Sequence, residues 1–431
     1  MNLAFLDAVL IASLSIPLIM AYRILPVVGT SYLGFGLIFG LLLFNILISS
    51  NIIVIPTKYF SRLKNILTIL ILTLVFGGVM FTAIVDRGRI APGSNYNVHD
   101  IVLQTESALR FLSEGKNPYK ETYFGTPMED WNYGEGLVNP ALYHFVMPPF
   151  YLLSAYPFFY TSMRTIGFFD GRMPLFFMVL TSIFALLYLF KNKSLFRIAT
   201  IFFILNPATV HYLVEGRSDL YSLSFLIIAL FLLNKRRFTL SSVVFSFAVL
   251  SKQTVWFMVP LWSAYLYQAL GKSFKQTLRQ ALVMLVVALI ISGPFVFWNP
   301  YAFFDSIIFY LSGNTTHGYP VSGYGLGMLL NQLGIIKDVQ AYYPFIYWQI
   351  ILGSLMFFWG IKKIFKKPNI GNLMLVHAIS LSVIWYVSRY FNNSHAGYLS
   401  TLFLLSYFLI SDENKLTDSS TSFRKKVTKN E

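Results

Sequence analysis

One long polar segment, from about residue 86 to residue 172, carries the residue types most suited to chemistry in this chain. Within it, Asp100 is the sharpest candidate, because a carboxylate at the mouth of a cavity could take a proton from an attacking hydroxyl group. A structural role fits the same residue, since Asn97 could cap a helix that places Asp100 in its third position, where the helix dipole favours an acid. The sequence leaves both interpretations open.

The residues around Asp100 predict an amphipathic helix from Val98 to Leu112 that lies on a membrane surface. Gln104 falls along the flank of this helix, as Asp100 does. His99 could support a site, but adjacent residues of a helix point to different faces, so a surface histidine is the favoured interpretation. Both His99 and Gln104 are candidate neighbours of the site.

Other short polar segments could supply cations. Lys252 stands alone between two apolar runs, where a cation is costly unless it is paired or useful. A lipid phosphate is one expected ligand, and extension of the side chain to the headgroups is the alternative. For the turn at residues 215–219, spacing alone favours a solvated helix connection in which the last residue caps the next helix. The further candidates in these segments are Glu215, Arg217, Asp219, His317, Tyr319, Arg389 and His395.

Composition sets the class of protein. Of 431 residues, 56% are hydrophobic and 12% are charged, which predicts an all-α polytopic membrane protein. The net charge of +15 comes from Lys and Arg in short clusters between apolar runs, a pattern of membrane topology that predicts no nucleic-acid partner. With no cysteine, disulfides and thiolate metal sites are excluded.

The apolar runs predict about twelve transmembrane helices, with a large first outer loop at residues 86–172. Basic clusters between the runs predict that both termini lie in the cytoplasm of a multi-pass cell-membrane protein and that this loop lies outside. The runs cover about residues 3–22, 32–55, 66–85, 173–190, 196–213, 220–234, 239–251, 254–270, 279–298, 342–361, 369–388 and 397–410.

Counting crossings gives two structural predictions. Residues 141–160 resemble a span, but both of their ends must be outside, so an interfacial or re-entrant helix is expected there. If the run from Phe238 to Leu270 were one helix, the basic cluster at residues 362–367 would lie outside. We therefore expect two short helices that turn near Lys252, which keep that cluster inside. Lys252 is then expected at the outer face.

An ordered set of motifs resembles the GT-C superfamily, whose members are polytopic glycosyltransferases that use polyprenyl-phosphate sugars. The likeness is greatest to prokaryotic and archaeal polyprenyl-phosphate-mannose-type mannosyltransferases, and it runs from about residue 66 to 410. The motifs are H-D-x-x-x-Q at residues 99–104, A-L-R-F-L-S-E-G-K-N-P-Y at 108–119, Pro148-Pro149, Asn206-Pro207, E-G-R-S-D at 215–219, L-S-K-Q at 250–253, W-N-P at 298–300, G-Y-P-V-S-G-Y-G-L at 318–326 and S-R-Y-F at 388–391.

The resemblance implies a catalytic core at residues 66–410 with amphipathic juxtamembrane helices in its outer loop, two additional N-terminal helices at 1–65 and a basic cytoplasmic tail at 411–431. It implies that Asp100 acts as the general base, and that Lys252 and Arg389 bind the donor phosphate. Some branches carry two successive carboxylates in this loop, whereas His99 occupies the first place here. No metal or cofactor is therefore assigned, and the expected partners are membrane lipids, the lipid-linked sugar and a glycan or glycolipid acceptor.

Two other classes of function stay open at this point. A lipid-linked sugar transporter predicts charged residues within the spans and symmetric halves, and Asp7 is the one acidic residue inside a predicted span. A non-catalytic protein of envelope assembly predicts no cavity near Asp100. No fixed-period repeat, phosphate-binding Gly-rich loop or zinc motif occurs in the sequence.

Overall fold

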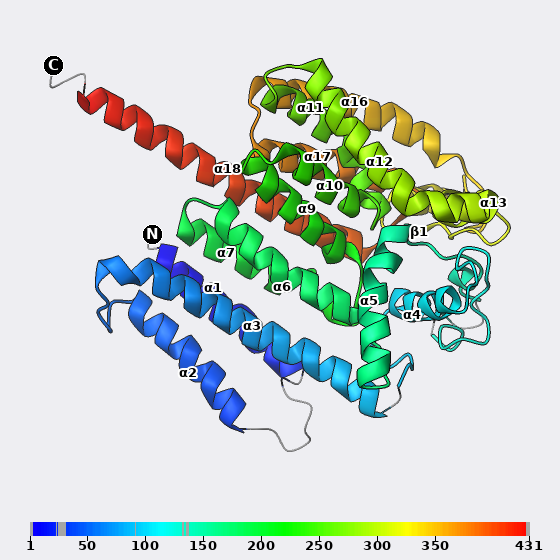
Figure 1. Cartoon of the computed structure of the whole chain (residues 1–431), viewed down its shortest axis with the longest axis horizontal. Helices are drawn as coiled ribbons and strands as arrows, with labels where there is room; N and C mark the ends of the chain where they lie inside the picture. The colour runs from blue at the N-terminus through cyan, green and yellow to red at the C-terminus, as the bar shows by residue number, and fades with distance from the viewer. Residues whose placement is uncertain are drawn as a thin grey trace.

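The computed structural model describes residues 3–22, 24, 32–90, 92–131, 133–134 and 138–427, with side chains as far as residue 414. The described segments are helical apart from one short strand pair (Figure 1). The helices of the N-terminal half are α1 (Leu3–Ala21), α2 (Tyr32–Ser49), α3 (Thr57–Ile90), α4 (Asp100–Ser113), the 3₁₀ helix η1 (Pro140–Tyr143), α5 (Pro149–Thr165), α6 (Arg172–Leu189), α7 (Lys193–Leu205), α8 (Val210–Glu215) and α9 (Asp219–Asn234).

The remaining elements follow in chain order. They are α10 (Phe238–Val249), the 3₁₀ helix η2 (Gln253–Met258), α11 (Val259–Ala269), α12 (Phe274–Trp298), α13 (Pro300–Phe304), the π-helical turn η3 (Asp305–Phe309), α14 (Tyr310–Ser312), β1 (Ser322–Gly323), α15 (Leu326–Gln332), α16 (Phe345–Lys366), α17 (Ile370–Tyr386), β2 (Tyr390–Phe391) and α18 (Asn393–Val427). The two strands are parallel, with Ser322 opposite Tyr390.

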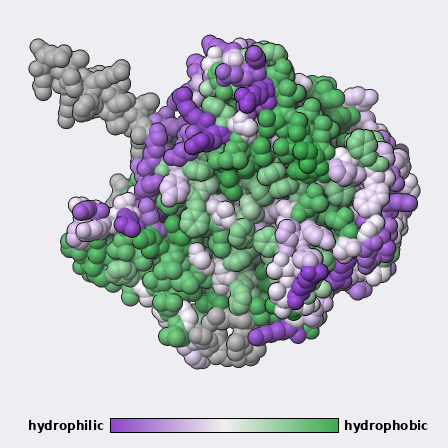
Figure 2. All heavy atoms as spheres, viewed as in Figure 1, coloured by the Kyte–Doolittle hydropathy of each residue, from purple (hydrophilic) through white to green (hydrophobic). Residues whose placement is uncertain are grey.

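The helices have the lengths and composition of a helical membrane protein. In the described residues, α1, α2, α3, α6, α12 and α16 are long and apolar enough to cross a bilayer, and α9, α10 and α17 are shorter apolar helices. Figure 2 shows a hydrophobic band between hydrophilic surfaces at opposite edges of the view. The prediction of an all-helical fold is confirmed, and the six long apolar helices are consistent with a membrane protein, whereas twelve crossings stay a prediction.

Both ends of the chain lie at one end of the bundle, and α4, α13 and β1 lie at the other (Figure 1). Contacts agree with this arrangement. Asp412 of α18 accepts hydrogen bonds from the backbone of Lys191 and Asn192, just after α6, and Lys367 at the end of α16 donates to Asn414 at 2.9 Å. Two of the predicted basic clusters, those with Lys191 and Lys367, therefore lie at the end of the bundle where α18 passes Asp412 and Asn414. Residues 428–431 of the predicted basic tail lie outside the described residues, and α18 continues to Val427.

A buried ionic cluster joins the N-terminal helices to the bundle. Asp7 of α1 lies 2.6 Å from the ammonium of Lys64 in α3 and 2.5 Å from the guanidinium of Arg197 in α7. Asn45 of α2 accepts a further hydrogen bond from Lys64 at 2.6 Å. Asp7, Lys64 and Arg197 are buried, so two residues of the predicted cytoplasmic clusters neutralise the one acid of α1 instead of facing water.

The prediction of α4 as an amphipathic helix on the membrane surface is wrong. Its residues Ile101–Leu109 are all buried, including Gln104 and Glu106 on the polar side. The loop that follows covers that side, because Gln104 donates hydrogen bonds to the backbone of η1 and the residue after it. Residues 141–160 also differ from the predicted single helix, since η1 ends at Tyr143 and α5 begins only at Pro149.

The predicted break near Lys252 is confirmed. α10 ends at Val249, Lys252 has extended backbone, and η2 begins at Gln253. α9 and α10 form an extensive pair, and the backbone N–H of Phe150 at the start of α5 donates to the carbonyl of Leu250. The chain therefore turns at the end of the bundle that also holds α4.

Candidate functional site

A cavity of about 1220 Å³ lies at the end of the bundle away from the termini. Segments that are far apart in the sequence form its walls. The apolar lining includes Trp256, Phe257, Ile308, Ile346, Ile350 and Phe357. The polar lining includes His99, Asp100, Gln104, Tyr133, Arg217, Asp219, Lys252, Tyr319, Arg389 and His395. Most of the candidate residues predicted from the sequence therefore share one cavity.

Asp100 is the first residue of α4, and His99 caps that helix. This differs from the predicted cap at Asn97. The Nδ1 atom of His99 lies 2.6 Å from a carboxylate oxygen of Asp100, and both side chains are mostly buried. The interpretation of His99 as a surface histidine pointing to another face is wrong, because a capping residue is not helical and its side chain can turn back over the first turn.

The cavity keeps the carboxylate of Asp100 ionised. Burial raises the pKa of this carboxyl group, but His99, Arg217 and the backbone N–H of Ile101 together lower it more strongly, so the net pKa is below its ordinary value. Asp100 lies in α4, outside the apolar helices that could span a bilayer. A base is therefore present at neutral pH.

Four buried charged side chains hold α4 in place, and none of them was a candidate residue in the sequence. Arg87 at the end of α3 donates to both oxygens of Glu106 in α4, at 2.7 and 2.8 Å, and to Asp170 at 3.0 Å. Arg172 at the start of α6 holds the same Asp170 with two hydrogen bonds, at 2.9 and 2.8 Å. Glu106 also accepts from the backbone N–H of Gly171 at 2.8 Å. The sequence shows two acidic residues and two arginines next to apolar runs, which could have marked them as buried charges. Their spacing along the chain does not indicate which residues form pairs.

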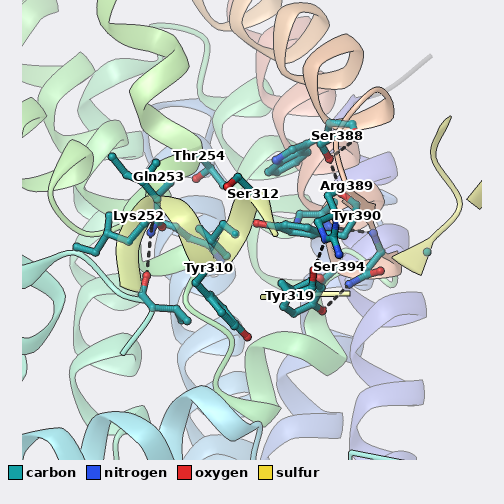
Figure 3. A pocket seen from close by; sticks show the side chains of 18 of the residues that line it. Lys252, Gln253, Thr254, Tyr310, Ser312, Tyr319, Ser388, Arg389, Tyr390 and Ser394 are labelled. Atoms are coloured by element: carbon teal, nitrogen blue, oxygen red, sulfur yellow. Dashed lines mark hydrogen bonds between the residues drawn. The ribbon is translucent and has the colours of Figure 1, made fainter. Parts of the chain in front are cut away.

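Lys252 does not face the cavity as a free cation. Its ammonium lies 2.7 Å from a carboxylate oxygen of Asp219, the first residue of α9 (Figure 3). Asp219 therefore forms an ion pair at this site instead of acting as the predicted cap of a solvated turn. The pair brings the turn after α10 against the start of α9.

Arg389 lies on the other side of the cavity from Lys252 in Figure 3 and is almost completely buried. Its guanidinium donates hydrogen bonds to the carbonyl oxygen of Tyr319 and to those of Val339, Gln340 and Ala341, the last three at 2.9 to 3.0 Å. These carbonyls belong to the two ends of the outer loop between α14 and α16. Arg389 therefore joins the two ends of this loop, whereas the resemblance implied that it binds the donor phosphate.

The other candidates divide into two groups. Arg217 lines the cavity and donates to the hydroxyl of Ser394 at 2.9 Å, and His395 lines it while accepting from the backbone of Asn392. Tyr319 also lines the cavity. Outside the lining, the His317 ring stacks on Tyr143 with centroids 3.6 Å apart.

Glu215 also lies outside the lining, and its backbone carbonyl anchors the start of α4 by accepting the N–H of His99 at 2.9 Å. Within the described residues, no three His, Asp or Glu side chains gather closely enough to hold a metal ion. Comparison of this chain with protein-family models, curated proteins and solved structures found no match.

Proposed function

We propose that this protein is an integral membrane glycosyltransferase of GT-C type. It moves a hexose such as mannose from a polyprenyl-phosphate donor to a hydroxyl group of a lipid-linked or glycan acceptor, at the extracytoplasmic face. The single observation that carries the proposal is the shared cavity, which places an ionised carboxylate, basic side chains and an apolar wall around one space. Each of these groups matches one part of the reactants.

The apolar wall suits the polyprenyl chain of the donor. Trp256, Phe257 and Ile350 belong to the wall of the large cavity. A second cavity of about 300 Å³ shares Trp256 and Ile308 with it and is lined almost entirely by apolar residues. An aliphatic chain buried along these walls leaves water without loss of hydrogen bonds, which favours binding.

In the proposed reaction, the acceptor oxygen attacks the anomeric carbon from the side opposite the phosphate. The new C–O bond forms as the bond between the anomeric carbon and the phosphate oxygen breaks, and polyprenyl phosphate departs with the bonding electron pair. Asp100 takes the acceptor proton, and His99 holds its carboxylate at 2.6 Å. One displacement inverts the anomeric configuration and needs no covalent enzyme intermediate. Basic side chains stabilise the charge on the departing phosphate.

Substitution of Asp100 tests the proposal. With purified protein in lipid nanodiscs, polyprenyl-phosphate mannose and a membrane extract as the source of acceptor, we expect Asp100→Asn to lower the transfer rate by about 10² to 10⁴. Glu114→Gln, on the exposed end of the same helix, is the control and should retain the wild-type rate. Near-normal transfer by Asp100→Asn contradicts the assigned base.

The same assay separates the other two classes of function. A transporter moves the lipid-linked sugar across the bilayer of a proteoliposome without forming a glycosidic bond. An assembly protein does neither. Absence of sugar transfer by the wild-type protein with each of several hexose donors contradicts the proposed enzyme.

A further inference from the structure

Three Lys or Arg side chains line the large cavity, in the part of the chain that the structure describes: Arg217, Lys252 and Arg389. Two of them are already engaged. Lys252 is neutralised by Asp219 at 2.7 Å, and each nitrogen of the Arg389 guanidinium donates to a backbone carbonyl. An anion that approached Lys252 would meet a charge that Asp219 already neutralises, and at Arg389 it would find four of the five N–H donors in use.

Arg217 differs from both. One of its terminal nitrogens donates to Ser394, but its buried Nε atom has no hydrogen-bond partner among the described residues. The nearest carboxylate oxygen, on the partly exposed Glu215, is 3.8 Å from Nε, beyond hydrogen-bond distance. A buried donor without a partner is costly, so this position favours a ligand that accepts hydrogen bonds.

The surroundings of Arg217 hold its guanidinium in place. Its Cζ atom lies over the ring of Tyr212, 4.5 Å from the centroid, and the hydroxyl of Ser394 accepts a hydrogen bond from one terminal nitrogen. Tyr212 and Ser394 also line the cavity. A guanidinium that is already oriented loses little freedom when it binds two oxygens of a phosphate in parallel.

We infer that Arg217 is the side chain that binds the phosphate of the polyprenyl-phosphate lipid, with Ser394 as its positioning residue. The inference rests on the proposed function for the identity of the lipid. Lys252 then serves to hold Asp219, and Arg389 joins the two ends of the outer loop. The two residues that the resemblance implied as phosphate ligands thus support the walls of the site.

Binding of a polyprenyl phosphate and of the polyprenol with the same chain length separates phosphate recognition from recognition of the chain. With protein in nanodiscs of neutral lipid, we expect the wild type to bind the phosphate form more tightly. Arg217→Ala should weaken binding of the phosphate form about 10- to 100-fold and leave polyprenol binding unchanged. Arg217→Lys should fall between the two, because lysine keeps the charge and loses the paired hydrogen bonds.

The matched control is Arg164→Ala, which removes an exposed arginine near the end of α5 outside the cavity. Its binding of both lipids should equal that of the wild type. Ser394→Ala keeps the charge of Arg217 and removes its hydroxyl partner, so a smaller loss is expected that is again confined to the phosphate form. Thermal unfolding of each variant shows whether the protein is folded before binding is compared.

Equal binding of polyprenyl phosphate by folded wild type, Arg217→Lys and Ser394→Ala overturns the inference. The inference is also overturned if Arg217→Ala weakens binding of a phosphatidic acid by the same factor, because the site would then bind any lipid phosphate. These binding measurements need no turnover. A wild type that transfers no sugar contradicts the proposed function, whereas loss of discrimination between phosphate and polyprenol in Arg217→Ala tests the phosphate site alone.

Discussion

At the scale of single residues, the close pair of His99 and Asp100 decides the chemistry of the cavity. Burial alone would favour a protonated carboxyl group, and the adjacent imidazole and Arg217 reverse that preference. His99 is held in turn by the backbone of Glu215 and by an edge contact with Trp131 at 5.7 Å between centroids. The ionisation of Asp100 thus depends on a neighbour whose position is fixed by two other segments.

If Asp100 is the base of the proposed sugar transfer, its lowered pKa sets the pH dependence of that reaction. A base acts only when ionised, so its activity is present above the folded-state pKa and is lost as the pH falls through it. We expect His99→Gln to raise that pKa toward the ordinary carboxyl value, and thus to move the acid limb of the kcat/KM profile to higher pH. The rate at neutral pH should fall roughly 10- to 100-fold, since a charge-assisted hydrogen bond is lost.

The control for this profile is His211→Gln. His211 forms a hydrogen bond with Tyr22 at 2.6 Å and does not line the cavity. It should leave the acid limb where the wild type has it. An unmoved acid limb in His99→Gln contradicts the role given to the histidine.

At the scale of elements, α4 is held by buried charges as well as by apolar residues such as Val102 and Leu109, which pack in the core. The buried arginines Arg87 and Arg172 and the acids Glu106 and Asp170 carry no net charge together, and they join the end of α3, the middle of α4 and the start of α6. A buried pair is strongly destabilised when one partner is removed, because the other charge stays behind. The position of Asp100 therefore depends on residues that do not contact the cavity.

Substitution of Glu106 tests this arrangement. We expect Glu106→Gln to destabilise the fold by about 3 to 5 kcal/mol, because Arg87 loses its main partner in a buried site. The measurement is thermal unfolding in detergent, monitored through intrinsic fluorescence. Glu114→Gln on the same helix, where the side chain is about half exposed, should change stability by less than about 0.5 kcal/mol. Equal Tm values for the two variants contradict the network.

At the scale of the whole molecule, the bundle has two chemically different ends. Lys191 and Lys367 lie at one end, where both contact the C-terminal half of α18, and the cavity lies toward the opposite end. Positively charged loops are retained on the cytoplasmic side of a bilayer. The cavity is therefore expected on the other side, where polyprenyl-phosphate sugars would meet their acceptors.

The absence of cysteine makes sidedness measurable. Single substitutions Glu114→Cys and Lys275→Cys place a thiol at exposed positions directly after α4 and at the start of α12. In intact cells, a membrane-impermeant maleimide should label Glu114→Cys and leave Lys275→Cys unlabelled. Permeabilised cells should show both labelled. The reverse pattern in intact cells places the cavity in the cytoplasm and contradicts the proposed reaction site.

The N-terminal helices are bound to the rest by the buried cluster of Asp7, Lys64 and Arg197. Asp7→Asn leaves two buried cations without their counter-charge, and we expect a loss of about 3 to 5 kcal/mol in thermal unfolding. Lys58→Ala, at an exposed position of the same end, should unfold like the wild type. A wild-type Tm for Asp7→Asn means that the helices are held by apolar packing alone.

The sequence by itself determined the membrane class, the turn at Lys252 and the gathering of polar candidates at one end. These features depend on hydropathy and on the alternation of apolar runs with basic clusters, which are local properties of the chain. The burial of α4 could not be predicted in this way, because a helix with polar residues along its flank has the same pattern whether lipid or protein covers it.

Only the tertiary structure decided which charge meets which. Asp7 and Arg197 are 190 positions apart, and their contact depends on how α1 packs against α7. The same holds for Lys252 with Asp219, and for Arg389 with the carbonyls of the outer loop. Whether two charged groups form an ion pair depends on distances of a few ångström between helices. Residue types and their spacing along the chain do not determine those distances.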